Sequence, residues 1–490
     1  MLEVVVFLCG AVVMILELVG SRLLAPYLGS SIIVWSSLIG TILGCLSLGY
    51  WWGGRLADRN PSNRVLAFII FLAALTTAVI PLSKPLTLGT LQHYAGSLHL
   101  GSTLATISLF AAPSVLLGMV SPYAVRLKLK NLEATGRTVG TLYAVSSIGS
   151  IFGTFLAGFV LIAFLGSTTI LFLLAGILVL ASLLISLRDR LLKAAGLLVL
   201  GLMGSALQNH ENRLADAGFF DVDTTYNRIF IYPSVEEPTG RPLRILTTHP
   251  KAVQSAMYPD DPISLAVPYT HFYRLLEHFK PDFQNILMLG GGGYSFPKYA
   301  LAHYPRAHLE VVELDPKVTA LARQFFAMPE TPRLSVRHQD ARIHLHAVKA
   351  AYDVILGDTF SSHFAIPFHL LTREAVQHLH DALAADGAAL INLLGAIEGR
   401  EGRFVRAAYR TFTAVFPQVY LFPVAAPDDP QCWQNIMLVA LKTTTEPTWH
   451  SSEATLERLL AHRWQRPVAD DVPVLTDDFA PTDHYTAMLQ

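Results

Sequence analysis

Hydrophobic residues are unevenly distributed along the chain, and the change falls near residue 208. Before it, long apolar stretches follow one another with short polar breaks. A helix needs roughly 20 apolar residues to cross about 30 Å of hydrocarbon, and only a helix or closed barrel satisfies its own backbone in lipid. The pattern predicts membrane helices near 3–25, 32–53, 65–84, 102–123, 139–163 and 168–187. A weaker stretch near 194–208 is short for a seventh crossing.

After residue 208 the pattern changes to short apolar strands that alternate with helix-like stretches. Strands are predicted at 285–290, 308–314, 333–337, 352–358 and 387–394. This alternation is typical of a doubly wound parallel sheet with helices on both faces. Two more strands, QVYLFP and NIMLVAL, follow with little helix between them, which favours the antiparallel hairpin of class I methyltransferase-like folds.

Three domains follow from this division. Residues 1–208 are predicted to form an α-helical transmembrane bundle of six or seven helices. Residues 209–275, which are rich in alternating and β-branched positions, are predicted to form a small β-unit. Residues 276–490 are predicted to form a Rossmann-like α/β nucleotide-binding domain.

Composition agrees with a part of the chain in lipid, since 52% of its residues are hydrophobic and only 15% are charged. The 36 basic and 37 acidic residues give no reason to expect a nucleic-acid partner. Cys9, Cys45 and Cys432 are widely separated, so neither a disulfide framework nor a metal site is expected. Within the first apolar stretch, Glu17 and Arg22 are ionisable groups at or near lipid depth, where charges are costly.

Candidate chemistry begins at the turn after the first strand of the sheet, because ligands of doubly wound folds bind at the carboxyl ends of strands. Gly290, Gly291, Gly292 and Gly293 form this turn, and Glu313 ends the next strand, where a carboxylate can accept ribose hydroxyls. In a dinucleotide GxGxxG motif the third glycine would fall at Ser295 or Phe296. An adenosyl ligand without pyrophosphate is therefore the better prediction.

Two more carboxylates follow strands of the same sheet. Asp340 and Ala341 come after the third strand, where Asp340 is placed to bond an adenine amino group. Asp358 ends the fourth strand, beside the expected meeting point of a sulfonium and an acceptor nucleophile. A carboxylate there can orient an amine and take its proton as a general base. A helix cap or loop position is the alternative interpretation of Asp358.

These stretches together resemble the spermidine synthase family of aminopropyltransferases. The resemblance rests on TTYNRIFI, Gln254 in AVQSAM, MLGGGGYSFPKYAL with VVELDPKV, HQDARIHL and YDVILGDTF, and it covers most of 220–440 in the family's order. It implies that Gly290–Gly292, Glu313, Asp340, Ala341 and Gln254 bind the cofactor and that Tyr226 and Tyr269 line the substrate site. It also implies that Asp358 is catalytic.

The sequence departs from the family at its amine anchors. Gly293 and Tyr294 stand where an aspartate is typical, and Ser361 replaces a second acidic residue. Tyr269 is followed by Thr270 and His271 rather than by the family's His-Glu, and LTTHP replaces LDG. Each ammonium of a polyamine must be paired with a carboxylate when it leaves water. Since such carboxylates are missing here, the sequence does not identify the acceptor substrate.

The resemblance implies aminopropyl transfer from decarboxylated S-adenosylmethionine to an amine, without a metal. It extends to bacterial fusions of a transporter-like bundle to a spermidine-synthase-like domain. The alternatives are methyl transfer from S-adenosylmethionine to an unknown acceptor, or a non-catalytic nucleotide or polyamine sensor that gates the bundle. The expected partners are a small-molecule amine or other nucleophile and the lipid bilayer, with a homo-oligomer left open.

Orientation follows from basic residues, which are enriched in cytoplasmic loops. They cluster in alternate loops, at Arg55, Arg59 and Arg64, at Arg126, Lys128, Lys130 and Arg137, and at Arg188, Arg190 and Lys193. Six crossings, with 194–208 interfacial, would return the chain to the cytoplasm, where S-adenosyl cofactors are supplied. We therefore expect a multi-pass protein of the inner membrane with a cytoplasmic soluble domain. A true seventh crossing would put that domain outside.

Overall fold

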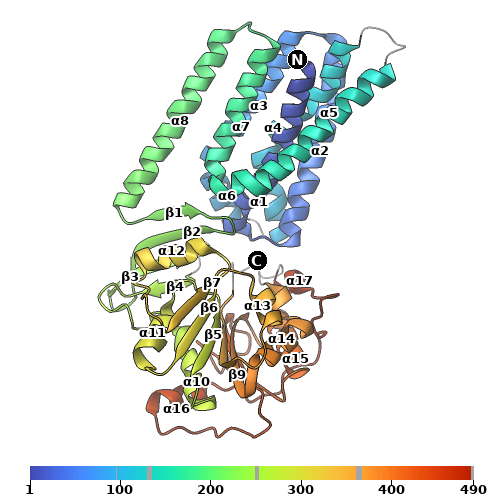
Figure 1. Ribbon diagram of the computed structural model, residues 1–490. Helices are drawn as coiled ribbons and strands as arrows, with labels where there is room; N and C mark the ends of the chain where they lie inside the picture. Colours follow the sequence, from blue (N-terminus) through green and yellow to red (C-terminus); the bar gives the residue numbers. More distant parts are fainter. Residues whose placement is uncertain (95–96, 130–134, 249–252, 360–366, 487–490) are drawn as a thin grey trace. The chain divides into compact units, whose positions relative to one another are not determined.

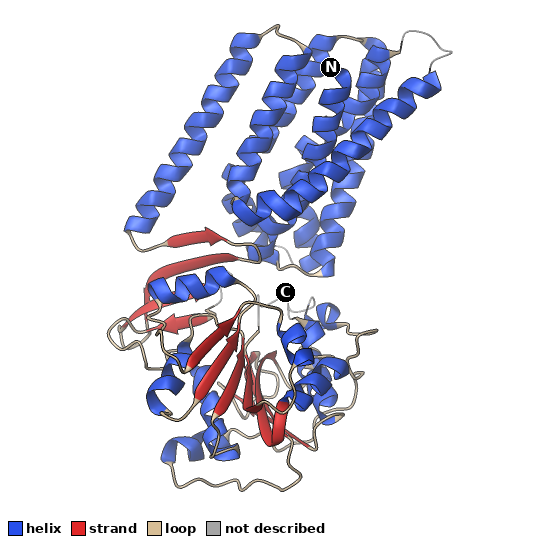
Figure 2. Cartoon of the chain, viewed as in Figure 1, coloured by secondary structure: helices blue, strands red, loops and turns tan. Residues whose placement is uncertain are grey.

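A computed structural model describes residues 1–490 except 95–96, 130–134, 249–252, 360–366 and 487–490. The chain divides into two compact units, Met1–Arg228 and Ile229–Leu489. The first is almost entirely helical, and the second combines helices with strands (Figure 1, Figure 2). The predicted domain limits at 208 and 275 stay predictions; the helix that contains residue 208 continues to Asp216.

Seven long helices of the first unit are apolar enough to cross a membrane, among the residues that the structure describes. The elements are α1 (Leu2–Leu28), α2 (Ile32–Arg59), α3 (Asn63–Tyr94), α4 (Leu98–Lys128), α5 (Thr135–Leu156), the π-helix η2 (Ala157–Leu161), α6 (Ile162–Phe164), α7 (Ser167–Ile185) and α8 (Arg190–Asp216), followed by β1 (Phe220–Asp223). The helices α5, η2 and α6 form one continuous span from Thr135 to Phe164. The weak stretch at 194–208 thus belongs to a 27-residue helix.

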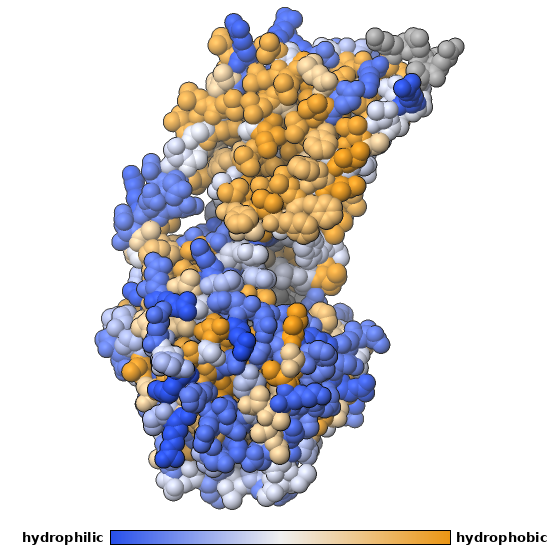
Figure 3. Space-filling view, viewed as in Figure 1, coloured by the Kyte–Doolittle hydropathy of each residue, from blue (hydrophilic) through white to orange (hydrophobic). Residues whose placement is uncertain are grey.

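Apolar side chains cover much of the face of these helices that Figure 3 shows. Phe159 and Phe164 are 72% and 79% exposed, and Leu191 and Leu198 of α8 are 82% and 65% exposed. A soluble monomer rarely exposes a continuous apolar surface of this kind. Inside the unit, Gly149 and Gly153 of α5 face the backbone of α1 so closely that an added Cβ would lie 2.1 Å from the Phe7 oxygen and 2.4 Å from the Ala11 oxygen. Small residues therefore set this helix contact, as in small-xxx-small pairs.

The second unit begins with a small antiparallel sheet and continues into an α/β domain. Its elements are β2 (Arg228–Val235), β3 (Pro242–Thr247), β4 (Ser255–Met257), α9 (Pro268–Phe272), η3 (Tyr273–Leu275), α10 (Leu276–Phe279), β5 (Asn285–Leu289), α11 (Ser295–His303), β6 (His308–Val312), α12 (Pro316–Phe325), β7 (Leu334–Arg337), α13 (Ala341–Ala347), β8 (Tyr352–Gly357), η4 (Phe368–Leu370), α14 (Arg373–Ala382), β9 (Leu383–Gly395), α15 (Arg403–Thr413), β10 (Gln418–Pro423), β11 (Gln434–Leu441), α16 (Ala454–Ala461) and α17 (Thr482–Thr486).

The large sheet has seven strands in the order β10-β11-β9-β8-β5-β6-β7. Strands β5 to β9 pair in parallel, and β11 pairs antiparallel with both β9 and β10. This confirms the predicted Rossmann-like sheet and its final antiparallel hairpin. The chain passes from β5 to β6 and β7 on one side and returns to β8 on the other side of β5. Crevices that bind ligands open at such a switch point, at the carboxyl ends of the strands.

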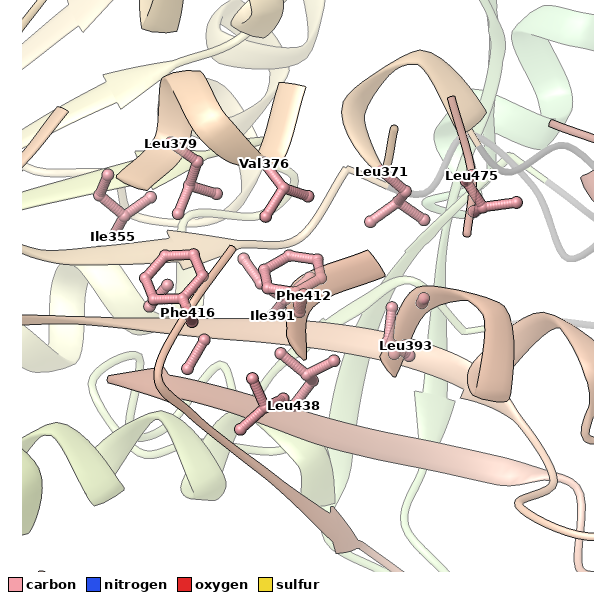
Figure 4. Close-up of a cluster of buried hydrophobic side chains, with 14 of the residues drawn as sticks. Ile355, Leu371, Val376, Leu379, Ile391, Leu393, Phe412, Phe416, Leu438 and Leu475 are labelled. Atoms are coloured by element: carbon pink, nitrogen blue, oxygen red, sulfur yellow. The ribbon is translucent and has the colours of Figure 1, made fainter. Parts of the chain in front are cut away.

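Both faces of this sheet are buried, which explains why its strands are nearly continuous apolar runs rather than alternating ones. In β8, Ile355 points into one core, and Val354 and Leu356 point into the other. Figure 4 shows the first core, where Phe412 and Phe416 lie with side chains of β9, β11 and α14. These two cores hold the carboxyl ends of β5, β6 and β8 in fixed positions.

Candidate active site

The glycine turn follows β5 and touches the end of β8. Gly290 has φ +90°, and a Cβ there would lie 2.1 Å from the backbone oxygen of Asp358. Gly292 has φ +50°, and a Cβ there would lie 2.8 Å from Ser255 Oγ. Only glycine adopts both this conformation and this close approach without strain. Neighbouring side chains hold the backbone N–H groups of the turn, since Gly293 N donates to Ser255 Oγ at 2.9 Å.

Glu313 follows β6 and fixes the glycine turn. Its Oε2 accepts a hydrogen bond from Gly291 N at 2.9 Å, and its Oε1 accepts one from Asp315 N at 2.9 Å. The residue is 9% exposed. Burial raises the pKa of Glu313, and the backbone N–H groups oppose this shift. Each carboxylate oxygen has a second lone pair, so the group can still accept hydroxyl donors from a ligand.

Asp358 lies at the end of β8 in a network of hydrogen bonds. Tyr269 Oη donates to its Oδ2 at 2.7 Å, and Asn392 Nδ2 donates to its Oδ1 at 3.1 Å. Asn435 Nδ2 donates to Asn392 Oδ1 at 3.0 Å, which fixes the orientation of that amide. Burial raises the pKa of Asp358 to about 6, against the effect of the two hydrogen bonds. A carboxyl with a pKa near 6 is deprotonated at neutral pH and binds a proton readily, as a general base requires.

Two of the other predicted residues belong to the same cluster. Tyr269, in α9, reaches the backbone oxygen of Gln254 at 3.3 Å in addition to Asp358. The structure thus brings Gln254, Tyr269 and Asp358 together with Gly290. The Tyr269 pKa lies well above its usual value because the phenol is buried and faces a carboxylate, so Tyr269 acts here as a hydrogen-bond donor.

The remaining predicted residues have other surroundings. Asp340 caps α13, where its Oδ1 accepts from Arg342 N at 2.7 Å, and its Oδ2 lies 3.6 Å from His369 Nε2. Ala341 is the first residue of that helix. Tyr226 is 50% exposed and belongs to the other compact unit. The adenine and acceptor roles of these residues stay predictions, and Ser361 lies outside the described residues.

Tyr294 follows the glycines, where the resemblance leads one to expect an aspartate. It has φ +53°, is fully buried, and its hydroxyl lies 2.7 Å from Thr319 Oγ1. Its ring lies under the glycine turn, since a Cβ at Gly291 would be 2.6 Å from it. The turn consequently presents no carboxylate of its own to a ligand. Among the described residues, no three His, Cys, Asp or Glu side chains gather in a way that could hold a metal ion.

Comparison with known families agrees with this arrangement. Residues 272–447, which include β5 to β11 and Asp358 but not Tyr269, match the spermine/spermidine synthase domain. The chain contains a spermine/spermidine synthase domain.

Known proteins similar to this chain include aminopropyltransferases and a methyltransferase. A polyamine aminopropyltransferase of Vibrio vulnificus is 28% identical over 169 residues, which cover 34% of this chain and about half of that protein (53%). The eEF1A lysine and N-terminal methyltransferase of Xenopus laevis is 25% identical over 143 residues, 27% of this chain and 21% of that protein.

One relative extends beyond the spermine/spermidine synthase domain. Polyamine aminopropyltransferase 1 of Streptomyces coelicolor is 24% identical over 417 residues, which cover 80% of this chain and 75% of that protein. A match of this length is longer than the whole of Ile229–Leu489. The similarity therefore includes part of the helical unit.

Sequence reasoning missed two amides of the site. Asn392 lies in β9 and is 3% exposed, and Asn435 lies beside it in β11. Asn392 lies within the apolar run INLL, and Asn435 begins the run NIMLVAL. A buried amide in such a strand needs hydrogen-bond partners, and that requirement is the signal that would have marked them.

Proposed function

We propose that the spermine/spermidine synthase domain transfers an aminopropyl group from decarboxylated S-adenosylmethionine to an amine. The observation that carries this proposal is the Asp358 carboxylate, which lies at the switch point between β5 and β8 and is oriented by Tyr269 and Asn392. The glycine turn and Glu313 form a nucleoside-binding edge next to it. The substrates and activity of the relatives support the same chemistry.

In the proposed reaction the unprotonated amine nitrogen attacks the carbon next to the sulfonium. A C–N bond forms, the C–S bond breaks, and the electron pair returns to sulfur, which leaves as neutral 5′-methylthioadenosine. The nitrogen then carries an extra proton, and Asp358 accepts it. The domain contributes mainly by positioning the two reactants in line, which can supply a large share of the rate. The pKa of about 6 keeps the Asp358 carboxylate ionised at neutral pH for this step.

Methyl transfer from S-adenosylmethionine is a second candidate. The turn at Gly290–Tyr294 carries no carboxylate to pair with the ammonium of an aminopropyl tail. The chain is also similar to the Xenopus laevis methyltransferase. The same carboxylate at Asp358 would then accept the proton of a methylated nitrogen.

We further propose that the helical unit holds the domain at a lipid bilayer. Its seven candidate spans expose leucine and phenylalanine side chains. A continuous apolar surface of this kind is rare on a protein surrounded by water.

The deciding experiment incubates purified full-length protein with each donor in labelled form and a panel of diamines and other amines. Aminopropyl transfer predicts labelled alkylated amine and 5′-methylthioadenosine in equal amounts. Methyl transfer predicts labelled methyl product and S-adenosylhomocysteine. Binding of a donor without transfer to any acceptor would contradict both reactions and would support a sensor.

A further inference from the structure

One end of the helical unit gathers the charged ends of several helices, and we call it the basic end. Three ion pairs define it: Arg64 Nε lies 3.0 Å from Asp189 Oδ2, Arg126 Nε lies 3.2 Å from Asp58 Oδ1, and Lys128 bonds Glu3. The first pair joins the starts of α3 and α8, the second joins the ends of α2 and α4, and the third joins the start of α1 to the end of α4. The start of α8 is also tied to the end of α7, because Lys193 Nζ donates to the backbone oxygen of Ser186 at 2.7 Å.

The residues that follow α8 lie at the other end of the same unit. Arg22, near the end of α1, donates to the backbone oxygen of Thr225 at 2.6 Å and also bonds that of Thr224. The backbone N–H of Ser167, at the start of α7, donates to Asp223 Oδ2 at 2.8 Å. Since α1 begins and α7 ends at the basic end, these contacts place residues 223–225 at the opposite end. Helix α8 therefore runs the full length of the unit, alongside α7 (Figure 1).

The dimensions of α8 fit a complete crossing. Its 27 residues span about 40 Å, which exceeds the roughly 30 Å of a hydrocarbon core. Leu191, Leu198 and Leu202 are 82%, 65% and 61% exposed, as expected for a face in contact with lipid. The charged residue in this apolar stretch, Lys193, lies within one turn of the start of α8 and is satisfied by backbone oxygens of α7.

The Lys and Arg residues identify the cytoplasmic end. Those that flank the turns of the basic end in the sequence are Arg55, Arg59, Arg64, Arg126, Lys128, Lys130, Arg137, Arg188, Arg190 and Lys193. The helix segments toward the other end carry fewer basic residues: Arg22 in α1, Lys84 in α3 and Arg213 in α8. Because short cytoplasmic loops carry the excess of Lys and Arg, the basic end is the cytoplasmic one.

We propose that α8 is a seventh membrane crossing and that the transferase unit Ile229–Leu489 lies on the non-cytoplasmic side. This differs from the sequence-based expectation of a cytoplasmic domain, which required an interfacial segment at 194–208. The inference rests on the proposed membrane location and not on the proposed chemistry. It has a consequence for the reaction: a charged sulfonium does not pass through hydrocarbon, so a transport step must supply the donor to that side.

Cysteine accessibility in the full-length chain tests the proposal. In a Cys432→Ser background the natural Cys9 and Cys45 stay buried in α1 and α2. Single substitutions are then made at exposed positions: Asn60→Cys at the basic end, Ser30→Cys at the opposite end, and Thr444→Cys on the transferase unit. Spheroplasts are treated with a membrane-impermeant maleimide before or after lysis. Labelling does not depend on catalysis, so an inactive transferase leaves this test intact.

The proposal expects Ser30→Cys and Thr444→Cys to be labelled in intact spheroplasts and Asn60→Cys only after lysis. Labelling of Ser30→Cys with protection of Thr444→Cys would overturn the seventh crossing. Labelling of Asn60→Cys alone in intact spheroplasts would overturn the assigned orientation. Equal labelling of all three before lysis, in intact spheroplasts that exclude the reagent, would overturn the membrane location itself.

Discussion

At the scale of single residues, the site combines carboxylates that the sequence predicts with amides that sequence analysis missed. Asp358 and Glu313 end strands, as their place in the sequence predicts. Their environments come from elsewhere: Tyr269 and Asn392 bond the first, and backbone N–H groups of the glycine turn bond the second. The predictions for single residues follow from these partners.

Asp358→Asn should retain donor affinity within a few fold and slow product formation by roughly 10²–10⁴, the usual contribution of a positioned general base. The amide keeps the shape of the carboxylate and loses its basicity. Calorimetry and single-turnover assays separate the two effects. Asp478→Asn, at an exposed position, serves as the matched control and should behave as wild type. Wild-type turnover by Asp358→Asn would show that the aspartate is structural.

The pH dependence of turnover should report the same carboxyl. Its pKa is raised to about 6, so Asp358 becomes protonated as pH falls through about 6 and the rate should fall with it. Above pH 6 the rate should rise less steeply, through the growing unprotonated fraction of the acceptor amine, whose pKa is about 10. The rate is measured at saturating donor. A rate that is flat between pH 5 and pH 8 would exclude Asp358 as the base.

Glu313→Ala should weaken donor binding by roughly 1.5–3 kcal/mol, because a charge-assisted hydrogen bond to the ribose is lost and the glycine turn loses its anchor. Glu330→Ala is the matched control, because the Glu330 side chain is 83% exposed. Calorimetry measures both variants, and circular dichroism verifies that they fold. If a folded Glu313→Ala variant binds as wild type, the carboxylate does not contact the donor.

At the scale of elements, close contacts between helices and the order of strands decide where these residues meet. The sequence YAVSSIGSIFGT predicts close helix packing without naming the partner, and the structure identifies the partner as α1. The strands were recognisable because both of their faces are apolar. Their order in the sheet brings β8 back beside β5, so that Asp358 touches the glycine turn.

The α1–α5 contact should be sensitive to volume. Gly153→Val should destabilise the full-length protein by about 1–3 kcal/mol, the usual cost of overpacking, because the new side chain meets the α1 backbone at Ala11. Gly140→Val is the control in the same helix, since nothing lies within 4 Å of its added Cβ. Thermal unfolding in detergent measures both. Equal melting temperatures would mean that α1 and α5 do not pack as described.

At the scale of the whole molecule, the two compact units differ in the surfaces that they expose. The helical unit exposes apolar side chains, and the transferase unit has two buried cores of its own. A unit with its own cores can fold without its neighbour.

The segment 214–490 expressed alone should therefore fold and bind an S-adenosyl donor with an affinity within a few fold of the full-length protein. Calorimetry with each donor measures this, and the Glu313→Ala form of the same segment is the control. A folded segment that binds neither donor would show that the helical unit contributes to the donor site.

The sequence by itself determined the features that depend on local pattern. Long apolar stretches predicted helices that can span lipid, and short apolar runs predicted strands buried on both faces. Gly290 to Gly292 indicated a turn that no other residue type can form. Glu313 and Asp358 could be found because parallel strands place their carboxyl ends at one edge.

The tertiary structure decided what depends on contacts between distant segments. The hydrogen bonds to Asp358 come from α9 and β9, and burial by these neighbours raises its pKa to about 6. Likewise, the hydropathy of 194–208 was ambiguous, and the contacts of Arg22 and Ser167 with residues 223–225 show the direction of α8. Such contacts join residues far apart in sequence, and local periodicity contains no information about which of them will meet.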